Sequence, residues 1–122
     1  MIYALVFALS LADTLTNYTQ CYAQAMNLQA WEIEIIFEPS EDIAGTVADP
    51  VYLMAQITYD TTQIKRDDEY VRWLVRHELY HVWEWEFAEY AERGKHEAAA
   101  LRLEEQQASR FARWPAWTGV CR

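Results

Sequence analysis

The longest helical signal in the chain runs through residues 67–94, DDEYVRWLVRHELYHVWEWEFAEYAERG. Acidic residues at its beginning, Asp67 to Glu69, favour a helix start because the helix dipole places positive partial charge there. Gly94, at its end, is the residue type that most often caps a helix C-terminus. The middle is apolar on nearly every side, which is typical of a helix that runs through a core. We therefore predict one helix of about seven turns over residues 67–93.

Inside this apolar stretch lies the motif HExxH, as His77-Glu78-Leu79-Tyr80-His81. On a helix, a spacing of four residues places both imidazoles on one face about 6 Å apart, where they can bind one metal ion. Glu78 lies about 100° around the helix from His77, beside such a metal. There it can act as a general base towards a water that the metal has acidified. The alternative is a set of core residues held by hydrogen bonds, but burying them without a metal costs several kcal/mol.

A zinc site of this kind needs a third protein ligand and an open position for water. Residues 95–113 are rich in Ala, Leu, Glu and Gln and should form a second helix that ends before Pro115. We expect Gly94 to be the turn of a pair of antiparallel helices. At 1.5 Å per residue, Glu105 then reaches nearly the same height as His81, roughly 17 to 20 Å from the turn.

Two other residues compete with Glu105 as the third ligand. His96, two residues past the turn, would lie about 15 Å from the level of the histidines, so we expect it at the surface or at a helix cap. Glu104 adjoins Glu105 but points about 100° away from it. Glu105 shares a helical stripe with Leu101, Ala108 and Ala112 that can pack on the first helix, and this favours Glu105. The predicted site therefore has four residues: the metal ligands His77, His81 and Glu105, and the catalytic general base Glu78.

HELYH and the later E-x-x-A-S-x-F-A, residues 105–112, together resemble the gluzincin peptidases, in which E-x-x-A-(D/N) on a later helix gives the third zinc ligand. The chain is most similar to ImmA/IrrE-type peptidases and to small phage and prophage metallopeptidases, over roughly residues 30–113. The resemblance implies a Zn²⁺ cofactor, a zincin-like fold and a peptide or protein substrate. It also implies that a strand at residues 52–59 borders the cleft and can pair with an extended substrate. The chain departs from the pattern at Tyr80, where Gly is frequent, and at Ser109, where Asp or Asn is frequent.

The rest of the sequence predicts the elements that would support this site. Residues 4–28 carry apolar side chains at helical spacing, and residues 31–37, WEIEIIF, alternate as in a half-buried strand. Residues 38–50 collect Pro, Gly, Ser and Asp and should form a surface loop. Residues 52–59, YLMAQITY, should form a second strand. We therefore predict an α+β, minimal zincin-like fold, in which a small sheet packs on an N-terminal helix and on the HExxH helix, followed by the glutamate-bearing helix.

The length and charge of the chain restrict its partners. With 122 residues it should be a single domain, residues 1–122, and 52% of its residues are hydrophobic, as in a globular protein. Its net charge is -9, and residues 1–64 contain no Lys or Arg, which argues against a nucleic-acid partner. That acidic half either keeps the protein soluble or engages a basic partner. The apolar opening MIYALVFALSLADTL lacks a basic start and the length to span a bilayer, so we expect no membrane partner.

The chain contains two cysteines, Cys21 and Cys121, which lie 100 residues apart and outside any CxxC motif. This spacing predicts neither a zinc-ribbon pair nor a disulfide framework. We therefore expect reduced cysteines and a cytoplasmic protein.

Two functions are compatible with these patterns. The first is a zinc-dependent endopeptidase, in which a metal-activated water and Glu78 hydrolyse a peptide bond. The second is a catalytically inactive binding or regulatory protein of phage or prophage type, which zinc only stabilises. Replacing Glu78 separates them, because only the enzyme depends on a general base. The sequence indicates neither the substrate nor the oligomeric state.

Overall fold

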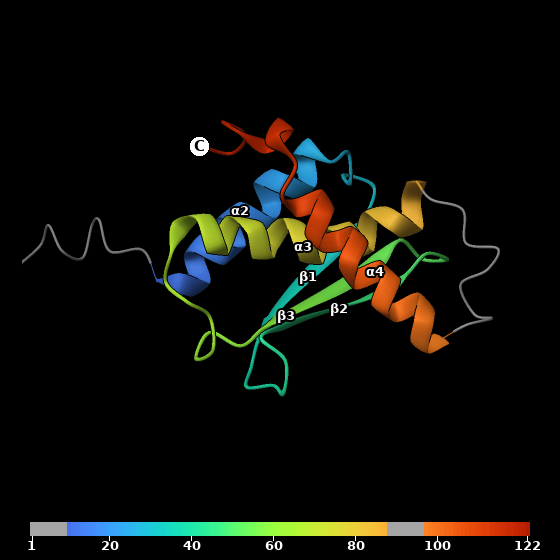
Figure 1. Cartoon of the computed structure of the whole chain (residues 1–122), viewed down its shortest axis with the longest axis horizontal. Coiled ribbons are helices and arrows are strands. Elements are labelled where there is room, and N and C mark those ends of the chain that lie inside the picture. Colours follow the sequence, from blue (N-terminus) through green and yellow to red (C-terminus); the bar gives the residue numbers. More distant parts are fainter. Residues whose placement is uncertain (1–9, 88–96) are drawn as a thin grey trace, which may run out of the picture.

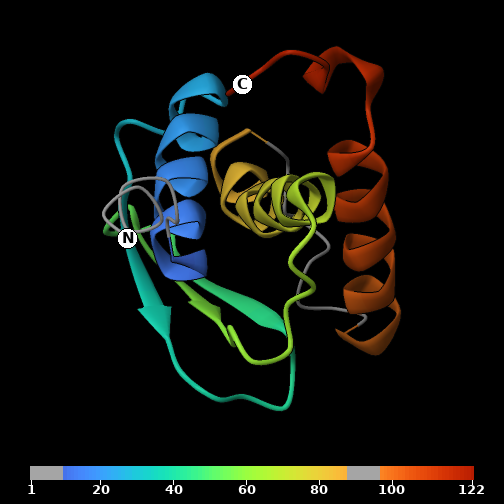
Figure 2. The same ribbon diagram turned by 90° about the vertical axis from the view of Figure 1, so that its left-hand side faces the viewer.

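The computed structural model describes residues 10–87 and 97–122 of the chain. In this part the protein has an α+β fold with three α-helices and a mixed three-stranded sheet (Figure 1), which confirms the predicted class. The elements follow in the order α2 (Leu11–Ala25), β1 (Glu32–Phe37), β2 (Ala44–Asp49), β3 (Met54–Tyr59), α3 (Asp68–Phe87), α4 (Glu97–Ala112) and a short 3₁₀ helix (Pro115–Trp117). Helix α3 lies between α2 and α4 and over the sheet (Figure 2).

Helix α2 forms the N-terminal wall of the core. Ser10 begins it as an N-cap, since its side-chain oxygen accepts a hydrogen bond of 3.0 Å from the amide of Asp13. Its buried side chains lie on one stripe: Leu11, Leu15, Thr19 and Tyr22. The predicted helix over residues 4–28 is thus confirmed from Leu11 to Ala25, while residues 4–9 lie outside the described part.

The sheet has the order β1-β3-β2, with β3 parallel to β1 and antiparallel to β2. The strands predicted at residues 31–37 and 52–59 are confirmed, the second beginning at Met54. The prediction of a surface loop over residues 38–50 is wrong, because β2 occupies Ala44–Asp49 within it. The β2 sequence AGTVAD is poor in typical strand formers, so pairing with β3 rather than local propensity makes it a strand.

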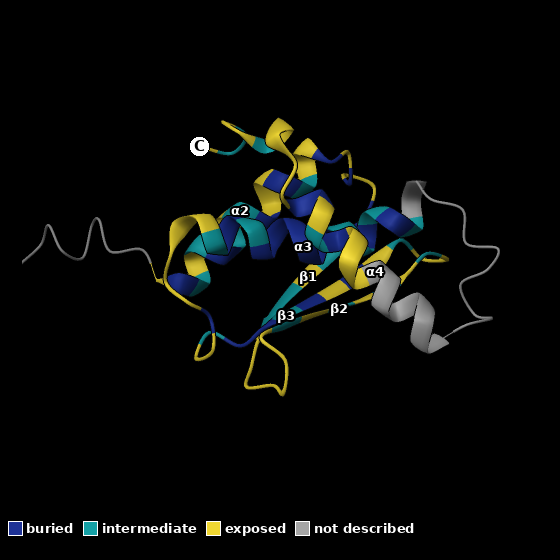
Figure 3. Cartoon of the chain, viewed as in Figure 1, coloured by how far each residue is buried: buried dark blue, intermediate teal, exposed yellow. Residues whose placement is uncertain are grey.

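The central strand β3 turns alternate side chains towards the helices. Ala55, Ile57 and Tyr59 are buried in the core, whereas Met54 is exposed on the opposite face. Helix α3 supplies the other side of this core and is buried along most of its length (Figure 3). Its described span confirms the predicted long helix up to Phe87. The predicted continuation to residue 93 and the cap at Gly94 fall on residues 88–96, outside the described part.

Arg76 on α3 fixes the end of α4. Its Nε and Nη2 donate to the carbonyl oxygen of Ala112 at 3.0 and 2.7 Å, and its Nη1 donates to the hydroxyl of Tyr22 at 3.1 Å. Ala108 and Ala112 are fully buried, which confirms the predicted packing stripe at these two positions, while the side chain of Leu101 lies outside the described part. Figures 1 and 2 show that α4 crosses α3 obliquely, whereas the prediction placed the two helices alongside each other.

The C-terminal segment returns to α2 and is linked to it by a disulfide. Cys21 and Cys121 are bonded, with their Cα atoms 5.9 Å apart, and Arg72 Nη1 donates to the carbonyl oxygen of Cys121 at 2.6 Å. The prediction of two reduced cysteines is therefore wrong, because the fold brings together residues that lie 100 positions apart. The expected cytoplasmic location rested on reduced cysteines and loses that support.

Among the described residues, no helix combines the length and the apolar character that crossing a bilayer requires.

Asp60, immediately after β3, holds together two loops at the end of the sheet. It is buried, and its carboxylate accepts hydrogen bonds from the amide of Ser40 at 3.0 Å, the hydroxyl of Thr62 at 2.6 Å and the side chain of Gln63 at 2.8 Å. The hydrogen bonds from Thr62, Gln63 and Ser40 lower the pKa of Asp60 below its usual range. A carboxyl with a lowered pKa stabilises the folded state while it is ionised.

We expect Asp60→Asn to reduce the free energy of unfolding at pH 7 and to have a clearly smaller effect at about pH 2, well below the unfolded-state pKa. The carboxyl titrates near pH 4 in the unfolded chain, so its stabilisation is present above that pH and is lost as the pH falls towards the lower folded-state pKa. Urea unfolding at both pH values measures the effect, with Asp42→Asn, an exposed neighbour, as the control. Equal losses at pH 7 and at about pH 2 would contradict this account.

Candidate metal centre

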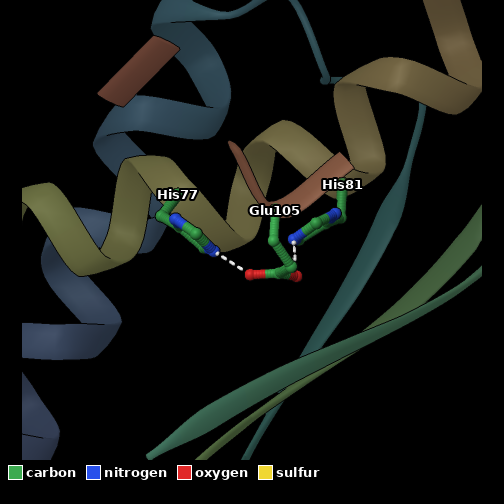
Figure 4. A group of neighbouring side chains, drawn as sticks. All are labelled: His77, His81 and Glu105. Carbon is green, nitrogen blue, oxygen red and sulfur yellow. Dashed lines mark hydrogen bonds and ion pairs between the residues drawn. The ribbon is translucent and has the colours of Figure 1, made fainter. Parts of the chain in front are cut away.

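The structure brings together the three residues predicted as metal ligands. His77 Nε2 lies 2.8 Å from Glu105 Oε2, and His81 Nε2 lies 3.0 Å from Glu105 Oε1 (Figure 4). The two imidazoles come from successive turns of α3, with ring centroids 5.4 Å apart, and the carboxylate reaches them from α4. Glu105 thus takes the place that the predicted geometry assigns to the third ligand. The side chains of Glu104 and His96 lie outside the described part.

The packing of α3 and α4 determines this arrangement. Arg76 precedes His77 and binds the carbonyl oxygen of Ala112, which lies seven residues after Glu105. Seven residues are close to two helical turns, so the anchored end of α4 and the carboxylate share one face of that helix. Fixing this end therefore directs Glu105 towards the histidines.

The three side chains have the composition and spacing of a metal site. One donor atom from each of His77, His81 and Glu105 lies within 4.8 Å of the other two. Tetrahedral coordination with bonds of about 2.0 to 2.1 Å places neighbouring ligand atoms about 3.3 Å apart, so small adjustments of the side chains fit an ion between them. Two buried or half-buried imidazoles bound to one carboxylate are an arrangement that can hold a metal ion.

Glu78 lies beside this centre and does not take part in it. Its Oε2 is 4.0 Å from His77 Nε2, while its Oε1 accepts a 2.8 Å hydrogen bond from the Thr46 hydroxyl of β2. Burial raises the pKa of the Glu78 carboxyl, against the opposing effects of His81, of the Thr46 hydrogen bond and of His77. A buried carboxylate that binds protons more readily than usual suits a general base.

Each histidine has an outer partner that the sequence analysis did not identify for it. The hydroxyl of Ser109 lies 3.3 Å from His77 Nδ1, and the buried carboxylate of Glu84 lies 3.6 Å from His81 Nδ1. Such partners orient a metal-binding imidazole and select which nitrogen faces the metal. Glu84 follows His81 by three positions on α3, a spacing that places them on one face and could have revealed the pair.

The pKa of His81 is raised by its acidic surroundings. Burial by itself would lower it, but the nearby carboxylates of Glu84, Glu78 and Glu105 outweigh that effect. Metal binding requires neutral imidazoles, so protons compete with a metal for this site.

The centre opens onto a cleft with a volume of about 1120 Å³. One wall comes from α3, including His77, Glu78 and His81, and the opposite wall comes from β2, including Ala44, Thr46 and Ala48. The prediction that residues 52–59 border the cleft as a pairing strand is wrong. Strand β3 is central, and because both of its edges already pair with β1 and β2, it has no edge left for a substrate. In the described sheet, β2 is an edge strand. A strand added to the sheet on this side would therefore pair with β2.

Comparison with known proteins gives no relative for this chain. No family model, no curated protein and no solved structure matches it. The arguments for its function therefore come from the site itself.

Proposed function

We propose that this chain is a zinc-dependent endopeptidase with a minimal zincin-like fold. The observation that carries the proposal is the group formed by His77, His81 and Glu105. The buried carboxylate of Glu78 lies next to this group and lines the same cleft. A structural zinc site usually has four protein ligands, whereas a catalytic site has three and leaves the fourth coordination position open for water. Three ligands with a separate carboxylate nearby therefore match the catalytic kind.

Zinc is a metal that fits this set of donors beside a carboxylate that can act as a base. Two imidazole nitrogens and one carboxylate oxygen match a frequent catalytic zinc ligand set. When bound, zinc polarises a carbonyl and lowers the pKa of water in its open position to about 7. His77, His81 and Glu105 would hold the ion, and Ser109 and Glu84 would keep the imidazoles oriented.

The residues around the cleft would then have two separate roles in peptide hydrolysis, proton transfer and substrate binding. Glu78 takes the proton of the attacking water on Oε2, the oxygen on the side of His77, and later passes it to the departing amine. Within the described residues, the outer edge of β2 pairs with no other strand, so it could accept an extended peptide and bring a scissile bond between that edge and α3. The cleft has a volume of about 1120 Å³ and is open at the surface, which is compatible with a peptide substrate.

We expect protein purified without chelators to contain about one zinc per chain by elemental analysis. His77→Ala and Glu105→Ala each remove a ligand, so each should weaken zinc binding by more than the roughly 10- to 100-fold that the loss of an outer partner costs. Glu32→Gln, an exposed position on β1, is the matched control and should bind zinc like the parent. A folded parent protein that takes up no zinc even when it is added back would overturn the proposed metal centre.

A further inference from the structure

The two carboxylate oxygens of Glu78 face different surroundings. Oε2 faces His77, at 4.0 Å from Nε2, whereas Oε1 lies 2.8 Å from the hydroxyl of Thr46. The same hydroxyl is also 3.2 Å from the backbone carbonyl oxygen of Glu78. Among the described residues, Thr46 is the side chain that hydrogen-bonds this buried carboxylate.

Thr46 reaches Glu78 because of its place on β2. It pairs with Ile57 of the central strand, so its side chain points towards the helices as that of Ile57 does. The other residues of β2 on this face are Ala44 and Ala48, which have no side-chain donor. Thr46 therefore carries the hydroxyl on the cleft face of β2, and it lies across from the general base.

We propose that Thr46 is a positioning residue for Glu78, an inference that rests on the proposed peptidase function. By donating to Oε1, the hydroxyl fixes the plane of the carboxylate and leaves Oε2 directed at the metal centre. A general base must lie within hydrogen-bond reach of the proton it accepts, and a displacement of about 1 Å can lower a rate by about 100-fold. Strand β2, which is proposed to bind the peptide, thus also orients Glu78, the general base for hydrolysis of that peptide.

The variant Thr46→Val tests this, because it keeps the shape and β-branching of the side chain and removes the hydroxyl. We expect kcat for a peptide substrate to fall by about 10- to 100-fold with KM nearly unchanged and zinc content equal to the parent. Thr46→Ser restores the hydroxyl and should recover most of kcat. Thr58→Val on β3 makes the same chemical change at a half-buried position away from the cleft and should leave kcat unaltered.

A measurement on the metal-free protein tests the contact without any turnover. The carboxylate signal of Glu78, assigned by its disappearance in Glu78→Gln, should shift in the ¹³C NMR spectrum of Thr46→Val and not of Thr58→Val. An active Thr46→Val variant with the kcat of the parent, or an unshifted Glu78 signal, would overturn the role of Thr46 and leave the peptidase proposal standing. A zinc-loaded parent that hydrolyses no peptide in a random library would overturn both.

Discussion

Glu78→Gln should lower peptide hydrolysis by about 100- to 10,000-fold while the protein keeps its zinc. Glutamine has the size of glutamate and can still accept the Thr46 hydrogen bond, but it cannot take up a proton from water. The proposed metal ligands His77, His81 and Glu105 are unchanged, so metal binding should not be affected. Steady-state kinetics and elemental analysis of the same preparation measure both properties together.

The control for this experiment is Glu32→Gln, which makes the same chemical change on the exposed side of β1 and should retain full activity. The combined result also separates the proposed enzyme from a zinc-stabilised binding protein. A parent that loses stability with His77→Ala, but whose biological function survives Glu78→Gln, would be a binding protein and not a peptidase.

The sequence predicts which three side chains come together, and part of that signal is local. HExxH places His77 and His81 one turn apart on any helix, and the alanine stripe around Glu105 indicates which face of the second helix packs inward. The choice of Glu105 also assumed that the second helix lies antiparallel to the first, and this relation between two elements is not local. Helix α4 instead crosses α3 obliquely, and Glu105 still reaches the histidines because Arg76 anchors the end of α4 close to the site.

The features that the sequence does not predict are those that depend on contacts between distant elements. Strand β2 has turn-forming and small residues, so only its pairing with β3 shows that it is a strand and that it borders the cleft. Thr46 becomes relevant to Glu78 only through this pairing. The Cys21–Cys121 bridge likewise follows from the return of the C-terminal segment to α2, for which a spacing of 100 residues gives no local signal.

This bridge should contribute strongly to stability. We expect Cys21→Ser to lower the free energy of unfolding by about 2 to 5 kcal/mol, because a cross-link between residues 100 positions apart removes much conformational entropy from the unfolded chain. A domain of this size has a total stability of about 5 to 15 kcal/mol, so the loss is a large part of it. Cys21 is exposed, so serine there leaves no cavity that would confuse the result. Urea unfolding with and without a thiol reductant measures the change.

Two further comparisons isolate the bridge from other effects of the substitution. Cys121→Ser and the double variant should lose no more stability than Cys21→Ser, since any of the three removes the same cross-link. Reductant should destabilise the parent by a similar amount and leave the variants unaffected. Because Trp117 packs on Phe111 of α4, with ring centroids 5.3 Å apart, releasing the C-terminal segment should also weaken zinc binding through Glu105. A parent whose unfolding does not respond to reductant, with two free thiols by titration, would show that the bridge does not form.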